Sequence, residues 1–203
     1  MMVVMASKTV LVTCGATVAF PRLVDVVLRK KLLERLSDAG FRRLIVQYGK
    51  GYETEFEKRL DAMGCVPTQC SLDDSVLGTT ATGSCCRSFV PKGLEIVGFE
   101  YSSKVQDIVR IADLVISHAG TGSILDALRA GRPLIVCVND ELMDNHQQQI
   151  ADRFEEKGYV WACKPRESEI AECLSRSQSE TLVQFPQAYS AQFENDLSRL
   201  AFK

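Results

Sequence analysis

Residues 114–126 read Leu-Val-Ile-Ser-His-Ala-Gly-Thr-Gly-Ser-Ile-Leu-Asp, and this stretch decides the fold class. The apolar run over residues 114–117 is typical of a buried strand, and the glycine-rich turn after it opens a helix at about Thr121. A strand that passes through a short turn into a helix is the repeating unit of a parallel sheet covered by helices. The stretch therefore predicts an α/β fold.

The same alternation of strands and helices extends in both directions from this stretch. Pro21 favours a helix start, apolar residues recur at every fourth position from Val24 to Leu36, and Gly40 ends the helix. Further strands are predicted at residues 9–13, 44–47, 94–97, 134–138 and 160–162. Further helices are predicted at residues 53–63, at 103–111, from about 145, and at 167–175. We therefore expect an open, mainly parallel sheet with helices on both faces.

Two segments depart from this alternation. Residues 66–92 are rich in Ser, Thr, Gly and Cys without a sustained period, so we expect an irregular insertion, either an elaborated loop or a short hairpin. Residues 175–186 are polar and turn-rich, and residues 188–202 are expected to form a last amphipathic helix through Phe193, Leu197 and Leu200. The predicted organisation is one domain over residues 1–178 and a tail over residues 179–203 that is detachable from the core.

The composition limits the class of protein. Hydrophobic residues make up 46% of the 203 residues and charged residues 25%, which is the balance of a soluble globular protein rather than a disordered or polytopic membrane one. A net charge of −2 gives no reason to expect nucleic acid as a partner. Apolar runs such as residues 134–138 fall far short of the ~20 residues that a membrane-spanning helix needs. The first nine residues do not read as a secretory signal, so we expect a cytoplasmic chain without a transmembrane segment of its own.

The cysteines do not suggest a disulfide framework or a metal site. Cys14 and Cys137 lie beside apolar strand-like runs, where reduced cysteine behaves as a small buried hydrophobe. The cysteines between residues 65 and 86 do not repeat a zinc-ribbon spacing, and the chain has only two histidines. The acidic side chains of residues 140–144 are best interpreted as a solvated loop. We predict no bound metal.

Two glycine loops are the candidate binding site. In an open α/β sheet, ligands bind beyond the carboxyl ends of the strands, because helix N-termini there present unpaired N–H groups and a positive dipole end. One loop follows the strand at residues 9–13 and contains Gly15 and Thr17. The other follows the strand at residues 114–117, and its members suited to wrap a diphosphate are Gly120, Thr121, Gly122 and Ser123. A tight turn explains either loop alone, but two such loops in one chain favour a binding site.

Polar residues on the following helices extend this candidate site. Asp126 lies one helical turn after Gly122, where a carboxylate can accept hydrogen bonds from a ribose diol; a favourable charge near the helix start is the alternative. Residues 144–149 read Asp-Asn-His-Gln-Gln-Gln at the entrance of a helix, and a helix start needs one cap rather than six polar residues. The further candidate ligands are therefore Asn145, His146, Gln147 and Gln148.

The two histidines have open roles. His118 and His146 could each act as a base, as a hydrogen-bond donor to phosphate or as a structural residue, and His118 lies at the carboxyl end of its predicted strand. A nucleophilic Ser117 activated by His118 is geometrically poor, because adjacent residues on a strand point to opposite faces. No catalytic residue is assigned from the sequence.

These motifs occur together in a known family. The loop at residues 117–123, Asp126, the Gly-Arg-Pro-Leu of residues 131–134 and the polar run at residues 144–151 closely resemble the catalytic subunits of eukaryotic UDP-N-acetylglucosamine transferases, which add the second N-acetylglucosamine to the dolichol-linked precursor of N-glycans. The loop at residues 12–17 fits as well, so the resemblance runs from about Val10 to Trp161. This family is similar to the carboxyl-terminal half of GT-B glycosyltransferases of family 28, such as the bacterial peptidoglycan enzyme. The resemblance implies a Rossmann-like, nucleotide-sugar-binding domain.

The resemblance also implies a role for each candidate. Gly15 and Thr17, with residues 120–123, would cradle the phosphates of UDP, and Asp126 would stand where the related enzymes hold the ribose with a glutamate. The run His146, Gln147 and Gln148 would cover the glutamine pair that contacts the sugar. Two departures are the shorter Asp126 and the insertion at residues 66–92, which has no evident counterpart in the bacterial enzyme.

A complete GT-B enzyme needs two Rossmann-like halves, and this chain has the length of one. The resemblance implies a membrane-anchored partner subunit that supplies the acceptor site and holds the chain on the cytosolic face of the endoplasmic reticulum. The expected reaction is inverting transfer from UDP-N-acetylglucosamine to N-acetylglucosaminyl-diphosphodolichol, without a cofactor, with the leaving UDP stabilised at the helix N-terminus of Thr121. Two alternatives are a non-catalytic nucleotide-sugar-binding or regulatory subunit, and a UDP-sugar hydrolase or epimerase. The tail over residues 187–203 is expected to help dock the chain to its partner; the alternative is that its apolar stripe folds back on its own domain.

Overall fold

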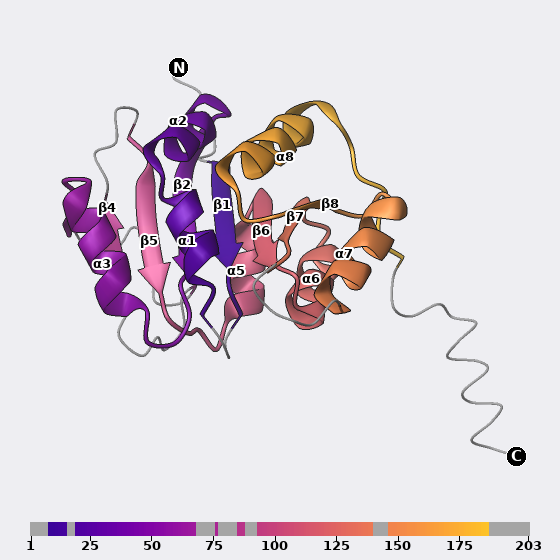
Figure 1. Cartoon of the computed structure of the whole chain (residues 1–203), viewed down its shortest axis with the longest axis horizontal. Helices are drawn as coiled ribbons and strands as arrows, with labels where there is room; N and C mark the ends of the chain where they lie inside the picture. Colours follow the sequence, from indigo (N-terminus) through magenta and orange to yellow (C-terminus); the bar gives the residue numbers. More distant parts are fainter. Residues whose placement is uncertain are drawn as a thin grey trace, which may run out of the picture.

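The core of the structure is a twisted sheet flanked by helices on both faces (Figure 1). The computed structural model describes residues 8–15, 19–67, 76, 85–87, 93–139 and 146–186. Over these residues the strand order is β3-β4-β5-β2-β1-β6-β7-β8. The strands are β1 Lys8–Thr13, β2 Phe41–Gln47, β3 Val66–Pro67, β4 Cys85–Arg87, β5 Glu95–Phe99, β6 Leu114–His118, β7 Leu134–Cys137 and β8 Trp161–Cys163. From β5 to β8 every neighbouring pair is parallel, whereas β3 and β4 run antiparallel at one edge.

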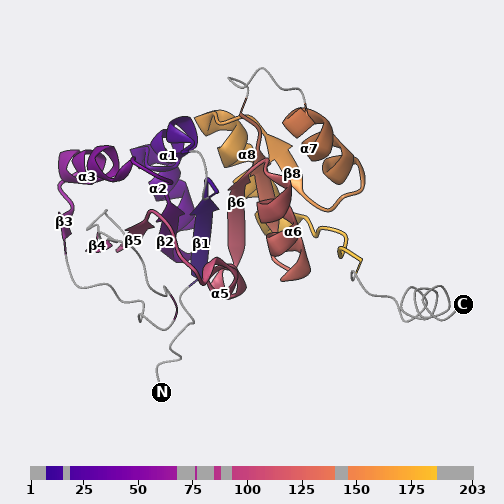
Figure 2. The ribbon, with the colours of Figure 1, turned by 90° about the horizontal axis from the view of Figure 1, so that it is seen from below.

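The helices fall into two layers, one on each face of the sheet (Figure 2). They are α1 Pro21–Val27, α2 Lys30–Asp38, α3 Glu53–Ala62, α5 Val105–Ile111, α6 Thr121–Arg129, α7 His146–Glu156 and α8 Glu167–Ser179. Apolar residues of α1, α2, α3 and α8 pack on one face, and those of α5, α6 and α7 pack on the other. Successive strand residues alternate between the layers: Val10 and Val12 of β1 join the first cluster and Leu11 joins the second. Both faces are covered, which is why the parallel strands are continuously apolar.

The predicted single helix at residues 21–40 is wrong, because the structure has two helices there. Leu28 caps the end of α1, and Arg29 takes an extended backbone with φ −67° and ψ 136° before α2 begins. Apolar residues at every fourth position drift by about 40° around a helix at each step, since four residues turn more than a full circle. A straight helix would carry Leu36 away from the sheet. The break at Leu28 and Arg29 lets each half present its own apolar face to the sheet.

Two short stretches of the predicted insertion form strands near one edge of the sheet. Residues 66–67 in β3 pair antiparallel with β4, and β4 pairs antiparallel with β5 in the register Cys86↔Ile96. These short strands fit the hairpin alternative. The rest of the insertion, apart from residue 76, lies outside the described residues.

The chain beyond the last helix stays on the body of the domain as far as it is described. Helix α8 continues to Ser179, one turn longer than predicted, because residues 176–179 keep the helical hydrogen bonds despite their polar side chains. The N–H of Val183 then donates to the carbonyl of Gly158 at 2.8 Å, and Phe185 stacks on Phe154 with ring centroids 6.1 Å apart. Residues 180–186, assigned from the sequence to a detachable tail, thus pack against the domain. The last predicted helix, at residues 188–202, lies outside the described residues.

No helix within the described part of the chain combines the length and apolarity needed to cross a membrane.

Candidate functional site

The topology brings the two predicted glycine loops together. Strands β1 and β6 are parallel neighbours, and the residue that ends β1, Thr13, is paired with Ser117 near the end of β6. The loops that follow these strands therefore start at the same level, at the carboxyl ends of the strands, where the arrowhead of β1 points (Figure 1). The predicted neighbourhood of Gly15 and Gly120 at the carboxyl ends of the strands is confirmed.

The side chain of His118 lies between the two loops. A Cβ built on Gly15 would lie 2.7 Å from its Cε1 atom, and a Cβ built on Gly120 would overlap its Nε2 atom. The Nδ1 atom lies 3.4 Å from the carbonyl oxygen of Thr13, which can only accept a hydrogen bond, so this contact places the hydrogen on Nδ1. Burial lowers the pKa of His118 below 6.5, and the Thr13 carbonyl opposes that shift. The imidazole is therefore neutral at physiological pH.

The amino end of α6 is open to a ligand among the described residues. Gly120 is the N-cap with φ −82° and ψ 127°, and no side-chain cap is present. The N–H of Ile124 donates to the carbonyl of Gly120 at 3.0 Å, so the amides of residues 121–123 come before this first helical bond. A Cβ built on Gly122 would meet nothing within 4 Å. Unpaired amides at the positive end of a helix favour an anionic group, which is the environment that the predicted diphosphate role requires.

Asp126 lies on the same helix, one turn further along. Its side chain is half-buried, and its Oδ1 atom accepts a hydrogen bond from Nε2 of Gln106 on α5 at 3.3 Å. This contact orients one carboxylate oxygen and leaves the other for a second donor. A ribose diol supplies such donors, so the geometry fits the predicted role.

A third glycine loop lies at the carboxyl ends of the strands and was missed in the sequence. Gly49 and Gly51 follow β2 with φ +83° and +77°, values that favour glycine, and Lys50 between them is exposed. A Cβ on Gly49 would lie 2.9 Å from Cα of Ala19, so the loop packs against the connection after β1. The N–H of Gly51 donates to Oε1 of Glu100, which follows β5, at 3.2 Å. The signal was available: Gly-Lys-Gly after an apolar strand repeats the pattern that marked the other two loops.

The polar run at the start of α7 is described only in part. Thr17 and Asn145 lie outside the described residues, and His146 begins α7 without a described side chain. Oε1 of Gln147 is buried without a hydrogen-bond partner among the described residues, whereas Nε2 of Gln148 donates to Oδ1 of Asp152 at 2.6 Å. Gln147 is thus the glutamine with an unused buried acceptor, and Gln148 is held by its own helix.

Among the residues that the structure describes, the thiols and Ser117 show no sign of nucleophilic chemistry. The Ser117 hydroxyl is fully buried and donates to the carbonyl of His118 at 2.9 Å, which confirms that Ser117 and His118 do not form a nucleophilic pair. Burial raises the pKa of the Cys14 thiol to about 12, against a weaker opposing hydrogen bond to Phe20. Cys137 and Cys163 are buried free thiols with sulfurs 3.4 Å apart. Within the described residues, no three His, Cys, Asp or Glu side chains are placed to hold a metal ion.

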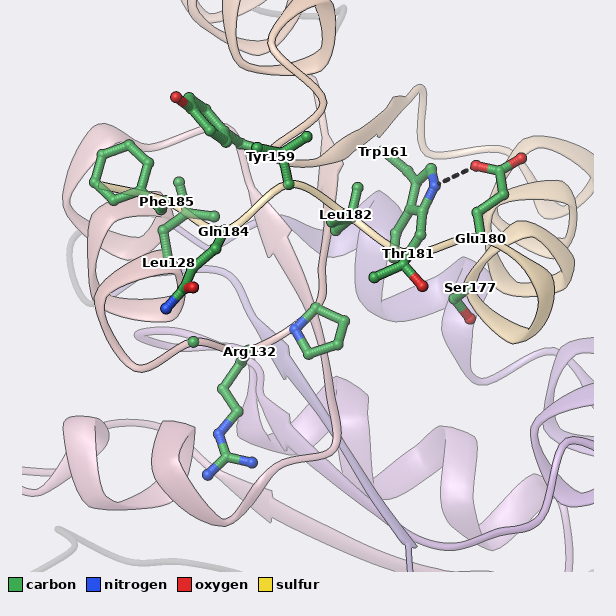
Figure 3. A pocket seen from close by; sticks show the side chains of 13 residues that line it. Leu128, Arg132, Tyr159, Trp161, Ser177, Glu180, Thr181, Leu182, Gln184 and Phe185 are labelled. Carbon is green, nitrogen blue, oxygen red and sulfur yellow. Dashed lines mark hydrogen bonds between the residues drawn. The ribbon is translucent and has the colours of Figure 1, made fainter. Parts of the chain in front are cut away.

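A pocket of about 410 Å³ lies elsewhere (Figure 3). Its walls include Pro133, directly before β7, and Trp161, the first residue of β8, so it opens at the amino ends of these strands. Residues 180–185 form another wall, and Nε1 of Trp161 donates to Oε2 of Glu180 at 2.9 Å. The glycine loops lie at the carboxyl ends, so this pocket is separate from the candidate site.

Comparison with known sequences identifies relatives over nearly the whole chain. The sequence profile of the glycosyltransferase family 28 C-terminal domain matches residues 9–200. The UDP-N-acetylglucosamine transferase subunit ALG13 of Saccharomyces cerevisiae is 47% identical over 194 residues, which cover 94% of this chain and 95% of that protein. The human protein of the same name is 31% identical over 172 residues, which cover 85% of this chain and 12% of the human protein.

Solved structures support the fold. The NMR solution structure of ALG13 has a TM-score of 0.74 and 45% identity, and the match covers 97% of this chain and 98% of that chain. The crystal structure of MurG from Acinetobacter baumannii has a TM-score of 0.58 at 14% identity, covering 96% of this chain and 50% of MurG. At that identity the likeness to MurG shows the fold alone. The predicted fold class, a Rossmann-like open sheet equivalent to one half of a GT-B glycosyltransferase, is confirmed.

Proposed function

This chain belongs to the glycosyltransferase family 28 C-terminal domain family, and from that premise we propose that it is the donor-binding catalytic subunit of a UDP-N-acetylglucosamine transferase. The observation that carries the proposal is the meeting of the Gly15 and Gly120 loops at the uncapped amino end of α6. An anionic diphosphate is the group that such an arrangement favours.

Each part of UDP-N-acetylglucosamine has a counterpart at this edge of the sheet. The diphosphate takes the amides of Thr121, Gly122 and Ser123, where no described side chain competes for them. The ribose diol takes the carboxylate of Asp126, which Gln106 already orients. The sugar takes the polar run of α7, in which Gln147 has an unused buried acceptor.

The chemistry of transfer then follows from binding. The bond between the sugar anomeric carbon and the β-phosphate oxygen breaks as negative charge develops on UDP. Amides fixed at the positive end of α6 stabilise that charge without reorganising, which lowers the barrier. The acceptor hydroxyl attacks from the opposite side, so the configuration inverts. We place the base that takes its proton on the partner, which binds the acceptor hydroxyl in this proposal.

The acceptor side of the reaction belongs to a second polypeptide in this proposal. MurG, which shares the fold, is about twice the length matched here, and the Saccharomyces cerevisiae relative is named as a subunit. We propose a membrane-anchored partner that binds N-acetylglucosaminyl-diphosphodolichol and recruits this chain to the cytosolic face of the endoplasmic reticulum. The chain itself needs no bound metal or cofactor in this mechanism.

Titration of the purified chain with UDP and with UDP-N-acetylglucosamine tests the donor site. We expect chemical-shift changes in the amides of Gly15 and residues 120–123, and calorimetric binding. Absence of both in the presence of the partner would contradict donor binding. Release of free sugar without any acceptor would favour a hydrolase, and binding without transfer in the presence of both acceptor and partner would favour a regulatory subunit.

A further inference from the structure

The imidazole of His118 lies between two loops that are far apart in the sequence. It contacts the backbone of Gly15 after β1 and that of Gly120 after β6, closely enough that a methyl group on either glycine would collide with it. Gly15 has φ +79°, which already favours glycine, but Gly120 has φ −82°, which any residue adopts. At Gly120 the absence of a side chain is therefore required by His118 and not by the backbone.

The ring also faces the end of β1. Nδ1 faces the carbonyl of Thr13 at 3.4 Å, and Nε2 lies beside Gly120, in the space that a side chain at that position would fill. The ring therefore joins the last residue of β1 to the N-cap of α6.

We propose that His118 is a positioning residue whose ring sets the separation of the Gly15 and Gly120 loops, and thereby the spacing of the amides that hold the donor diphosphate. This inference rests on the proposed function. It assigns His118 to the support of the donor site, where the sequence alone left a base, a phosphate ligand and a structural residue open. A diphosphate that bridges two loops is sensitive to their separation, because hydrogen bonds weaken steeply outside a narrow range of distance and angle.

A double-mutant cycle between Gly120→Ala and His118→Ala tests the proposal. Gly120→Ala alone drives its methyl into the ring, and His118→Ala alone leaves the loops without a spacer, so each is expected to weaken UDP binding by about tenfold. In the double variant the methyl enters space that the ring has left. We expect that variant to bind UDP within about threefold of His118→Ala, well short of the hundredfold loss that independent effects predict.

Gly98→Ala is the matched control for collision in general. Gly98 lies in β5, which β2 separates from β1, and a Cβ there would overlap the ring of Phe56 on α3 rather than a residue of the Gly15 or Gly120 loop. Gly98→Ala should lower the thermal midpoint while the folded protein keeps its UDP affinity. Gly120→Ala should lower the affinity as well, and should shift the amide resonance of Gly15 in the absence of ligand.

The outcomes separate this inference from the proposed function. Failure of the wild-type chain, alone and with its partner, to bind UDP contradicts the proposed function, while the Gly15 resonance still reports on the spacer. Wild-type binding with additive losses in the cycle, or an unmoved Gly15 amide in Gly120→Ala, overturns the role of His118. If Gly120→Ala does not fold, the double variant must regain both fold and UDP binding, and its failure to do so also overturns the role.

Discussion

Gln106 on α5 donates a hydrogen bond from Nε2 to Oδ1 of Asp126 on α6, over 3.3 Å. The contact joins two helices on the same face of the sheet and fixes a half-buried carboxylate one turn below the open end of α6. An oriented carboxylate forms hydrogen bonds to a diol at less entropic cost than a free one. The relationship makes Asp126 the side chain on which donor affinity should depend most.

Asp126→Ala is expected to weaken UDP binding by about 1.5 to 3 kcal/mol, because charge-assisted hydrogen bonds to the ribose are lost. Asp126→Glu keeps the carboxylate and should retain most of the affinity. Calorimetric titration measures both. Asp107→Ala removes a charge from the exposed face of α5, where Asp107 pairs with Arg110, and serves as the control. Equal UDP affinity in Asp126→Ala and the wild type would remove Asp126 from the site.

Gly122→Val should abolish transfer without unfolding the protein. Among the described residues, nothing lies within 4 Å of a Cβ at this position, so the fold accepts the side chain, but the side chain covers the amides that bind the diphosphate. Arg129→Val is the control, because it places a β-branched residue in the last turn of the same helix, away from these amides, at a propensity cost of about 0.5 kcal/mol. Transfer rates and thermal midpoints of the two variants are compared. Near-normal transfer by Gly122→Val would favour the interpretation of this glycine loop as a tight turn that binds no diphosphate.

His118 should make stability depend on pH below neutrality. Burial lowers the pKa of His118 in the folded state below its ordinary value of 6.5. Between these two pKa values the unfolded chain therefore binds more protons than the folded chain. The stability that the neutral ring contributes is complete above pH 6.5 and is lost as the pH falls below it through the folded-state pKa. Urea unfolding at pH 7.5 and 5.5 should show a larger loss for the wild type than for His118→Gln. Equal losses of unfolding free energy between pH 7.5 and 5.5 in the two proteins would argue against a buried neutral His118.

Removal of residues 187–203 should leave the donor site intact and weaken assembly with the partner. The described contacts of the chain end with Phe185, which packs on Phe154 and Tyr159, and these contacts survive the truncation. UDP titration and co-purification with the membrane subunit measure the two effects. Removal of residues 180–203 is the control, since it also deletes the bond from Trp161 to Glu180 and should lower the thermal midpoint. An unfolded 187–203 deletion, or unchanged co-purification, would contradict the docking role.

The order of strands and helices was predictable because its signals are local. Each of the six parallel strands is an apolar run, and turns such as Gly40 and Gly131 separate the elements. The glycine loops were predictable for the same reason. The break at Arg29 was not, because a four-residue repeat looks continuous in a sequence even though it drifts around the helix.

The features that depend on packing could not be predicted. The position of β1 between β2 and β6 requires crossovers that no single segment encodes. The placement of His118 against Gly15 and Gly120 joins residues about 105 positions apart, and no sequence signal distinguishes a glycine needed for a turn from one needed for a neighbouring ring. Strand β4 lacks the length of a recognisable strand and is defined by its pairing with β3 and β5.

Transfer of radiolabelled N-acetylglucosamine from UDP-N-acetylglucosamine to N-acetylglucosaminyl-diphosphodolichol, measured with this chain alone, the membrane subunit alone and both together, tests the central claim most directly. We predict an inverted disaccharide-lipid product only when both are present, and its loss when the chain carries Gly122→Val. Full transfer by this chain alone, or by the membrane subunit without it, would contradict the claim that this chain is the donor-binding half of a two-subunit transferase.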